Sequence, residues 1–127
     1  MKIKLTSVFV DNQQKALAFY TGVLGFVAKQ NIPMGEFSFL TVVSPEELDG
    51  TEVLLEPNEN PAASTFQKAL FDQGIPLTAF QVDNIQQEYD RLVNLGVEFQ
   101  TPPTPMGPAI VATFNDTCGN LIQIYQV

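Results

Sequence analysis

The sequence contains no histidine and only one cysteine, Cys118, which narrows the chemistry open to it. Without histidine, a Ser-His-Asp triad, a histidine general base and a histidine metal ligand are all excluded. A lone cysteine forms no disulfide within the chain and builds no cysteine zinc site, and it is typical of a reducing cytoplasm. Cys118 has no neighbouring cation in the sequence that would favour a reactive thiolate. Among the remaining polar groups, the candidates are above all the carboxylates of Glu52 and Glu56 and the amide of Gln123.

Charge and hydropathy exclude several classes of partner. Fourteen acidic and six basic residues give the 127-residue chain a net charge of −8. Nucleic acids and anionic membranes bind through clustered Lys and Arg, so we expect neither as a partner. No apolar run approaches the roughly 18 residues that a membrane helix needs, and the first nine residues do not resemble a signal peptide. We therefore expect a cytoplasmic globular protein, whose partner is a small molecule.

The first half of the chain predicts a strand, a helix and three further strands. Alternating apolar residues indicate a strand over 1–10, and apolar residues at helical spacing indicate a helix over 12–24. Asp11 or Asn12 is expected to cap this helix, with Gln14 forming a capping box with Asp11. The strands that follow are expected over 27–32, 37–43 and 51–56, with a turn over 44–50.

The second half repeats this order. Val82-Asp83-Asn84 matches Val10-Asp11-Asn12 at an offset of 72 residues, and Gly96 ends the second helix as Gly25 ends the first, at an offset of 71. A duplicated βαβββ module explains the match. The second set is a strand over 77–82, a helix over 84–95, a short pairing segment at 98–100, a proline-rich loop or edge over 101–108, and strands over 110–114 and 121–127. We expect one domain, with module 1 over 1–56, a linker helix within 57–74 and module 2 over 75–127.

Two sequence motifs resemble those of the vicinal-oxygen-chelate superfamily, which includes glyoxalase I, bleomycin-resistance proteins and extradiol dioxygenases. Ala18-Phe19-Tyr20 followed by Val23-Leu24-Gly25-Phe26 is similar to the family's A-F-Y-x-x-x-L-G-F signature. Asp116-Thr117-Cys118-Gly119-Asn120, followed by Leu121-Ile122-Gln123-Ile124, is similar to its D-P-D-G-N-x-x-E-L ending. The resemblance covers nearly the whole chain. It implies an α+β fold in which two βαβββ modules form a cup-shaped, mostly antiparallel sheet with helices on the convex face, and a homodimer, as in similar short members.

In metal-dependent members, four ligands stand on the first and fourth strands of the two modules. Register places these positions here at Leu5, Leu54, Leu77 and Gln123, and a two-residue shift would exchange Leu54 for Glu56. Leucine has no lone pair, and one amide with one carboxylate makes a poor site for Mn, Fe, Ni or Zn. The chain thus resembles a member without the metal ligands, and we expect no metal and no cofactor.

The same resemblance implies which residues line the cup. Glu56 and Gln123 are the expected polar anchors; a solvated Glu56 and a Gln123 bonded to a neighbouring strand are the alternatives. Those expected to bind the ligand are Leu5, Ser7, Phe9, Glu52, Leu54, Glu56, Leu77, Ala79, Gln123 and Tyr125, with Gln81 and either Phe39 or Leu40 on the same faces. Tyr20 is expected in the core instead, and Asp116, Gly119 and Asn120 are expected to shape a turn.

Three functions follow as hypotheses. The first is metal-independent binding or sequestration of a small cationic or aromatic molecule in an apolar cup. The second is a glyoxalase-like lyase, isomerase or dioxygenase, in which Glu56 would be the base and Gln123 or Tyr125 would polarise the substrate. The third is a regulatory or stress protein without ligand chemistry. The identity of a ligand does not follow from the sequence.

Overall fold

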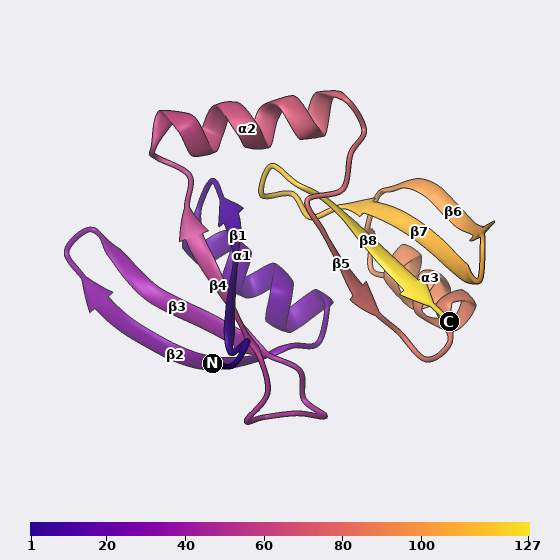
Figure 1. Cartoon of the computed structure of the whole chain (residues 1–127), viewed down its shortest axis with the longest axis horizontal. Helices are drawn as coiled ribbons and strands as arrows, with labels where there is room; N and C mark the ends of the chain where they lie inside the picture. Colours follow the sequence, from indigo (N-terminus) through magenta and orange to yellow (C-terminus); the bar gives the residue numbers. More distant parts are fainter. The chain divides into compact units, whose positions relative to one another are not determined.

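The computed structural model describes all 127 residues, and the chain divides into two compact units, residues 1–65 and 66–127. Each unit holds a four-stranded sheet, and the strand orders β1-β4-β3-β2 and β5-β8-β7-β6 are equivalent (Figure 1). The elements are β1 (Leu5–Val10), α1 (Gln13–Ala18), η1 (Phe19–Val23), β2 (Val27–Met34), β3 (Phe37–Val43), β4 (Glu52–Pro57), α2 (Pro61–Asp72), β5 (Thr78–Gln81), α3 (Ile85–Asn94), β6 (Phe99–Met106), β7 (Ala109–Asn115) and β8 (Leu121–Gln126). The expected α+β fold of two βαβββ modules is confirmed. None of the helices is long and apolar enough to cross a membrane.

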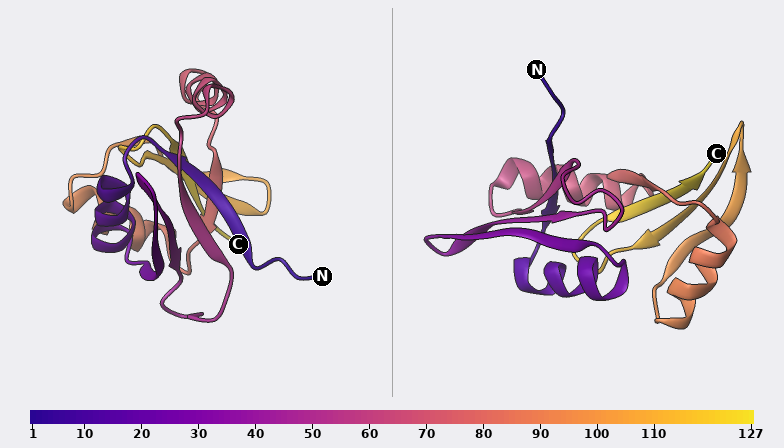
Figure 2. Two further views of the ribbon diagram at one scale, coloured as in Figure 1. Left: turned by 90° about the vertical axis from the view of Figure 1, so that its left-hand side faces the viewer. Right: turned by 90° about the horizontal axis from the view of Figure 1, so that it is seen from below.

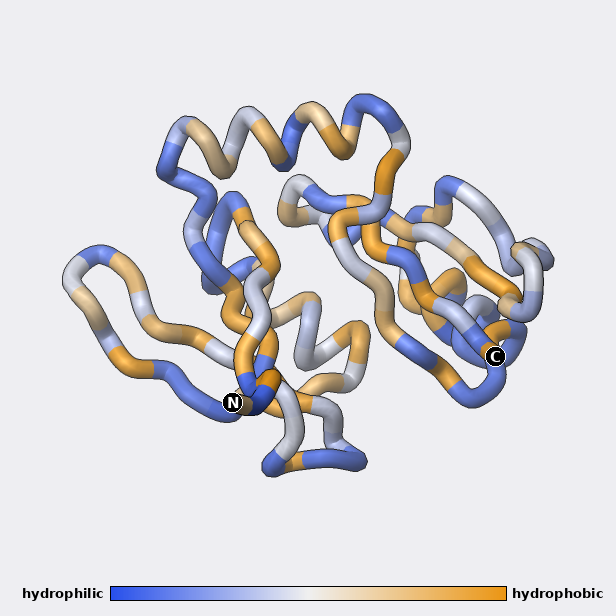
Figure 3. The backbone as a smooth tube through the Cα atoms, in the orientation of Figure 1, coloured by the Kyte–Doolittle hydropathy of each residue, from blue (hydrophilic) through white to orange (hydrophobic).

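Both sheets are mostly antiparallel, as expected. The first and last strands of each module pair in parallel, and the other two pairings are antiparallel. The turn expected over 44–50 joins β3 to β4, and Figure 3 shows it at the bottom of the view as mostly hydrophilic. A parallel pairing requires a long connection, which α1 and the β2–β3 hairpin supply in the first module.

One face of each sheet packs against a helix. In the first unit α1 lies against β3 and β4, and in the second α3 lies against β6, β7 and β8 (Figure 2). Side chains on these faces form the core, and the largest of them are fully buried: Val8, Val10, Leu40, Leu55, Phe114 and Ile122. Tyr20 is also fully buried, which confirms its place in the core. We call the opposite face of each sheet its open face; in the first sheet it carries Ser7, Phe9, Phe39, Thr41, Glu52, Leu54 and Glu56.

The first helix differs from its prediction in two respects. Asn12 alone is the N-cap, because its side chain accepts a hydrogen bond from the Lys15 amide at 2.9 Å. Asp11 lies one residue too early to cap and pairs with the Lys15 ammonium at 3.1 Å, so the predicted capping box with Gln14 is wrong. The helix also changes to π geometry at η1 before it ends at Gly25, whose φ of 88° suits glycine.

Several strand boundaries also differ. The proline-rich segment is the edge strand β6, which tolerates Pro102, Pro103 and Pro105 because it pairs only with β7 and shifts register twice. The edge alternative was therefore right and the loop alternative wrong. β1 begins only at Leu5, and Leu77 lies just before β5, although its amide donates to the Leu121 carbonyl at 2.9 Å.

A buried polar network shapes the turn between β7 and β8. The Asp116 carboxylate accepts hydrogen bonds from the backbone amides of Cys118 and Asn120 and from the Asn120 side chain, at 2.8–3.0 Å. Gln67 of α2 donates its side-chain amide to the Cys118 carbonyl and to Asn120 Oδ1, at 3.1 and 2.9 Å. The turn is thus shaped by Asp116 and Asn120 as expected, and Gln67 ties α2 to it.

Replacing Gly119 by Ala should destabilise the protein by about 1–3 kcal/mol. Gly119 has a φ of 101°, and an added Cβ would lie 2.7 Å from Gln67 Nε2. Gly22→Ala is the matched control, because its Cβ would meet nothing within 4 Å, and in a helical segment it should be neutral or stabilising. Urea unfolding of both variants measures the difference, and equal stability would contradict the role of the Gly119 turn.

Candidate functional site

The register of the two sheets fixes which residues occupy equivalent positions. Thr41 is the partner of Leu54 in β3–β4, and Thr113 is the partner of Gln123 in β7–β8. In the parallel pairs, Phe9 opposes Glu56 and Gln81 opposes Tyr125. Leu54 is therefore the structural counterpart of Gln123, and Glu56 is the counterpart of Tyr125. This internal equivalence favours Leu54 over Glu56 as the counterpart of Gln123.

Of the four positions at which the resemblance implies metal ligands in the enzymes, three are leucines here. Leu5 is 47% exposed at the start of β1, and Leu54 and Leu77 are half-buried. Only Gln123 offers an oxygen lone pair. The chain holds no group of three or more His, Cys, Asp or Glu side chains arranged to bind a metal ion.

A closed ring of hydrogen bonds lies on the open face of the first sheet; we call it the Glu52 ring, and its members are Gln30, Thr41 and Glu52. The Thr41 hydroxyl donates to Glu52 Oε1 at 2.6 Å, and the Gln30 side-chain amide donates to the same oxygen at 2.7 Å. The Gln30 backbone amide donates to Thr41 Oγ1 at 3.1 Å and so completes the ring. Glu52 was expected to bind ligand, but its two partners were not found from the sequence.

A β-bulge brings these three residues together. Ala28 pairs with Val42, but Gln30, rather than Lys29, pairs with Thr41, so Lys29 is the extra residue. The bulge reverses the alternation of faces in β2 and places Gln30 on the same face as Thr41. Glu52 reaches the ring from the start of β4, across β3.

The ring favours the ionised form of Glu52. Hydrogen bonds from Gln30, then from Thr41, lower the pKa of the Glu52 carboxyl below its ordinary value, and the positive charges of Lys29 and Lys4 add to this effect. Partial burial raises the pKa, by less than either hydrogen bond lowers it but by more than either lysine does. Each donor favours the charged form because a carboxylate accepts a hydrogen bond more strongly than a neutral carboxyl does.

Glu56 and Gln123, the anchors expected from the sequence, are half-buried and make no hydrogen bond through their side chains. The strand-to-strand bond considered for Gln123 is therefore absent. No buried side-chain nitrogen or oxygen of the chain lacks a hydrogen-bond partner, so the polar atoms of both residues are reachable by solvent. Both remain candidates for contact with a ligand.

The other candidates differ in exposure. Phe9 and Tyr125 are half-buried, whereas Ser7, Ala79 and Gln81 are exposed. Phe39 shares the open face with Thr41, whereas Leu40 is fully buried on the helix side. Phe39 is thus the member of that pair that remains a candidate.

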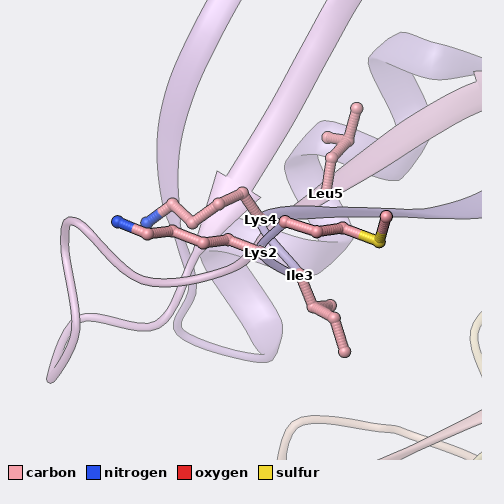
Figure 4. Close-up of a pocket in the computed structure, with 5 residues that line it drawn as sticks. Lys2, Ile3, Lys4 and Leu5 are labelled. Atoms are coloured by element: carbon pink, nitrogen blue, oxygen red, sulfur yellow. The ribbon is translucent and has the colours of Figure 1, made fainter.

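An open hollow of about 570 Å³ lies beside the N-terminal segment and is lined by Met1–Leu5. Figure 4 shows the side chains of Lys2 and Lys4 extending to one side of this segment, away from Leu5. Ile3 is 85% exposed there. The hollow offers no side chain of the Glu52 ring, and we assign no site to it.

The two equivalent βαβββ modules, each with an open sheet face, define the class of protein. A sequence model of the Glyoxalase/Bleomycin resistance protein/Dioxygenase superfamily matches residues 2–124, and the chain belongs to this superfamily. The chain is 57% identical over 126 residues to the protein YurT of Bacillus subtilis (strain 168), with 99% of each chain covered.

Solved structures share the fold. The crystal structure of UcmS2 superposes with a TM-score of 0.84 at 27% identity, covering 98% of this chain and 97% of that one. TnmS3, described as an antibiotic binding protein from Streptomyces sp. CB03234, superposes with a TM-score of 0.75 at 23% identity, covering 99% of this chain and 95% of that one. The second likeness shows the fold alone.

Replacing Glu52 by Leu should destabilise the protein by about 1–3 kcal/mol, because it leaves the fully buried Thr41 hydroxyl without its acceptor. Glu52→Gln should cost less, since an amide oxygen can still accept both hydrogen bonds. Glu56→Leu is the control, because the Glu56 carboxylate makes no hydrogen bond. Urea unfolding at neutral pH ranks the three variants, and a Glu56→Leu loss as large as that of Glu52→Leu would contradict the structural role of the ring.

Proposed function

We propose that the protein binds a small apolar or aromatic molecule on the open face of its first sheet, without a metal ion. One observation carries the proposal. Along β4, the half-buried Leu54 stands between two carboxylates, Glu52 and Glu56, and the paired strand β1 adds Ser7 and Phe9 on the same face. Small-molecule sites are typically built in this way, from apolar surface with a few polar groups that orient the ligand.

Binding accounts for these residues better than catalysis does. Without histidine, few side chains can transfer protons near neutral pH. In addition, Leu5, Leu54 and Leu77 occupy the positions at which the resemblance implies metal ligands in the enzymes. This chemistry supports metal independence, because a leucine side chain cannot coordinate an ion.

A protein described as binding an antibiotic shares this fold. TnmS3 is described as an antibiotic binding protein, so this fold can serve binding. We extend the proposal to a cytoplasmic homodimer, on the single cysteine of the chain and on the pairing that is usual for similar short members.

A fragment screen followed by amide NMR tests this function. Aromatic fragments that bind should shift the amide signals of Ser7, Leu54 and Glu56. Leu54→Asn should then weaken the best fragment at least tenfold, because it puts a polar amide in the apolar part of the site. A metal chelator should leave the affinity unchanged.

Leu48→Asn is the matched control, because Leu48 is 52% exposed in the turn between β3 and β4 and lies outside the proposed site. Equal loss in both leucine variants, or shifts confined to other surfaces, would overturn the proposed site. Loss of binding on chelation would overturn metal independence alone.

A further inference from the structure

We infer that the anchor at Glu52 selects a neutral hydrogen-bond donor, such as a phenolic hydroxyl or an N–H group, on an otherwise apolar ligand, and that it does not select a cation. This inference rests on the proposed function and specifies the class of ligand. It follows from the arrangement of the two Glu52 oxygens and from the charges around them.

The two oxygens of Glu52 differ in their surroundings. Oε1 accepts hydrogen bonds from both Thr41 and Gln30, whereas Oε2 accepts none from the protein. Because no buried polar side-chain atom of the chain lacks a partner, Oε2 is reachable by solvent. An ionised carboxylate oxygen only accepts hydrogen bonds, so a ligand group that meets Oε2 must be a donor.

The charges near Glu52 argue against a cation. The Lys29 ammonium donates to the Leu48 carbonyl at 3.0 Å and to Asp49 Oδ1 at 3.3 Å, and the Lys4 ammonium donates to the Asp49 carbonyl. Both ammonium groups act electrostatically on Glu52. A cationic ligand at Glu52 would therefore meet two like charges.

The ring also determines what Glu52→Gln would do. Two donors, from Thr41 and Gln30, face the Oε1 position, so the amide oxygen of the variant must take that position. Its NH₂ group then takes the Oε2 position. The substitution thus converts the free acceptor into a donor, and the preferred ligand should change from a donor to an acceptor.

Three probes that share a naphthyl ring system test the inference: 2-naphthol, 2-methoxynaphthalene and 2-naphthyltrimethylammonium, titrated at pH 7 with amide NMR. The native protein should bind 2-naphthol at least tenfold more tightly than the other two. Glu52→Gln should weaken 2-naphthol at least tenfold and should not weaken the methoxy ether. Glu36→Gln is the matched control, because Glu36 is exposed in the turn between β2 and β3, outside the proposed site, and it should keep the native preference.

Each contrary outcome separates the inference from the proposed function. If the ammonium probe binds the native protein most tightly, or if all three bind the open face equally, the donor preference is wrong and the proposed function stands. If 2-naphthol loses as much affinity in Glu36→Gln as in Glu52→Gln, the assignment to Glu52 is wrong. If no probe shifts the open-face amides at millimolar concentration, the proposed function fails and the inference fails with it.

Discussion

The site depends on one interaction, the hydrogen bond from the Thr41 hydroxyl to Glu52 Oε1. Thr41 is fully buried, so its hydroxyl needs an acceptor, and Glu52 is the acceptor within reach. In return, Thr41 and Gln30 hold the carboxylate in a single orientation, in which one oxygen is saturated and the other is free. The two hydrogen bonds to Glu52 Oε1 therefore have two effects: they stabilise the sheet, and they orient the carboxylate so that its other oxygen can accept a hydrogen bond from a ligand.

Comparison of the two modules shows that only the first sheet has a carboxylate at the position of Glu52. The second sheet keeps a register shift in its edge strand and a threonine pair, with the Thr113 amide donating to Thr101 Oγ1 at 3.2 Å. At the position of Glu52, however, it has Leu121, which is buried. The second sheet instead presents the neutral Gln123 at the position of Leu54. The two modules thus share a backbone and differ in the polar group that each open face offers.

Local patterns in the sequence predicted the modules and the faces, because alternation, helical spacing and glycine termini depend on neighbouring residues. They did not predict the partners of Glu52. The bulge at Lys29 shifts the register of β2 by one residue, and its effect appears only when β2 pairs with β3. Strand parity places Glu52 and Glu56 on the same face and so cannot tell which of them has partners. The structure shows that only Glu52 reaches Thr41 and Gln30. The role of Gln67 was not predicted either, because the turn that it binds lies some fifty residues away in the sequence.

The central claim is that Thr41 and Gln30 hold Glu52 as a carboxylate, and the most direct measurement is an NMR titration of the Glu52 side-chain carboxyl carbon. The account predicts a pKa below the ordinary value of 4.5 in the native protein and a higher pKa in Thr41→Val. Because the folded pKa is lowered, the stability that it contributes is present above the ordinary value and is lost as the pH falls through the folded pKa. A native Glu52 pKa at or above 4.5, or one that Thr41→Val does not raise, would contradict the account.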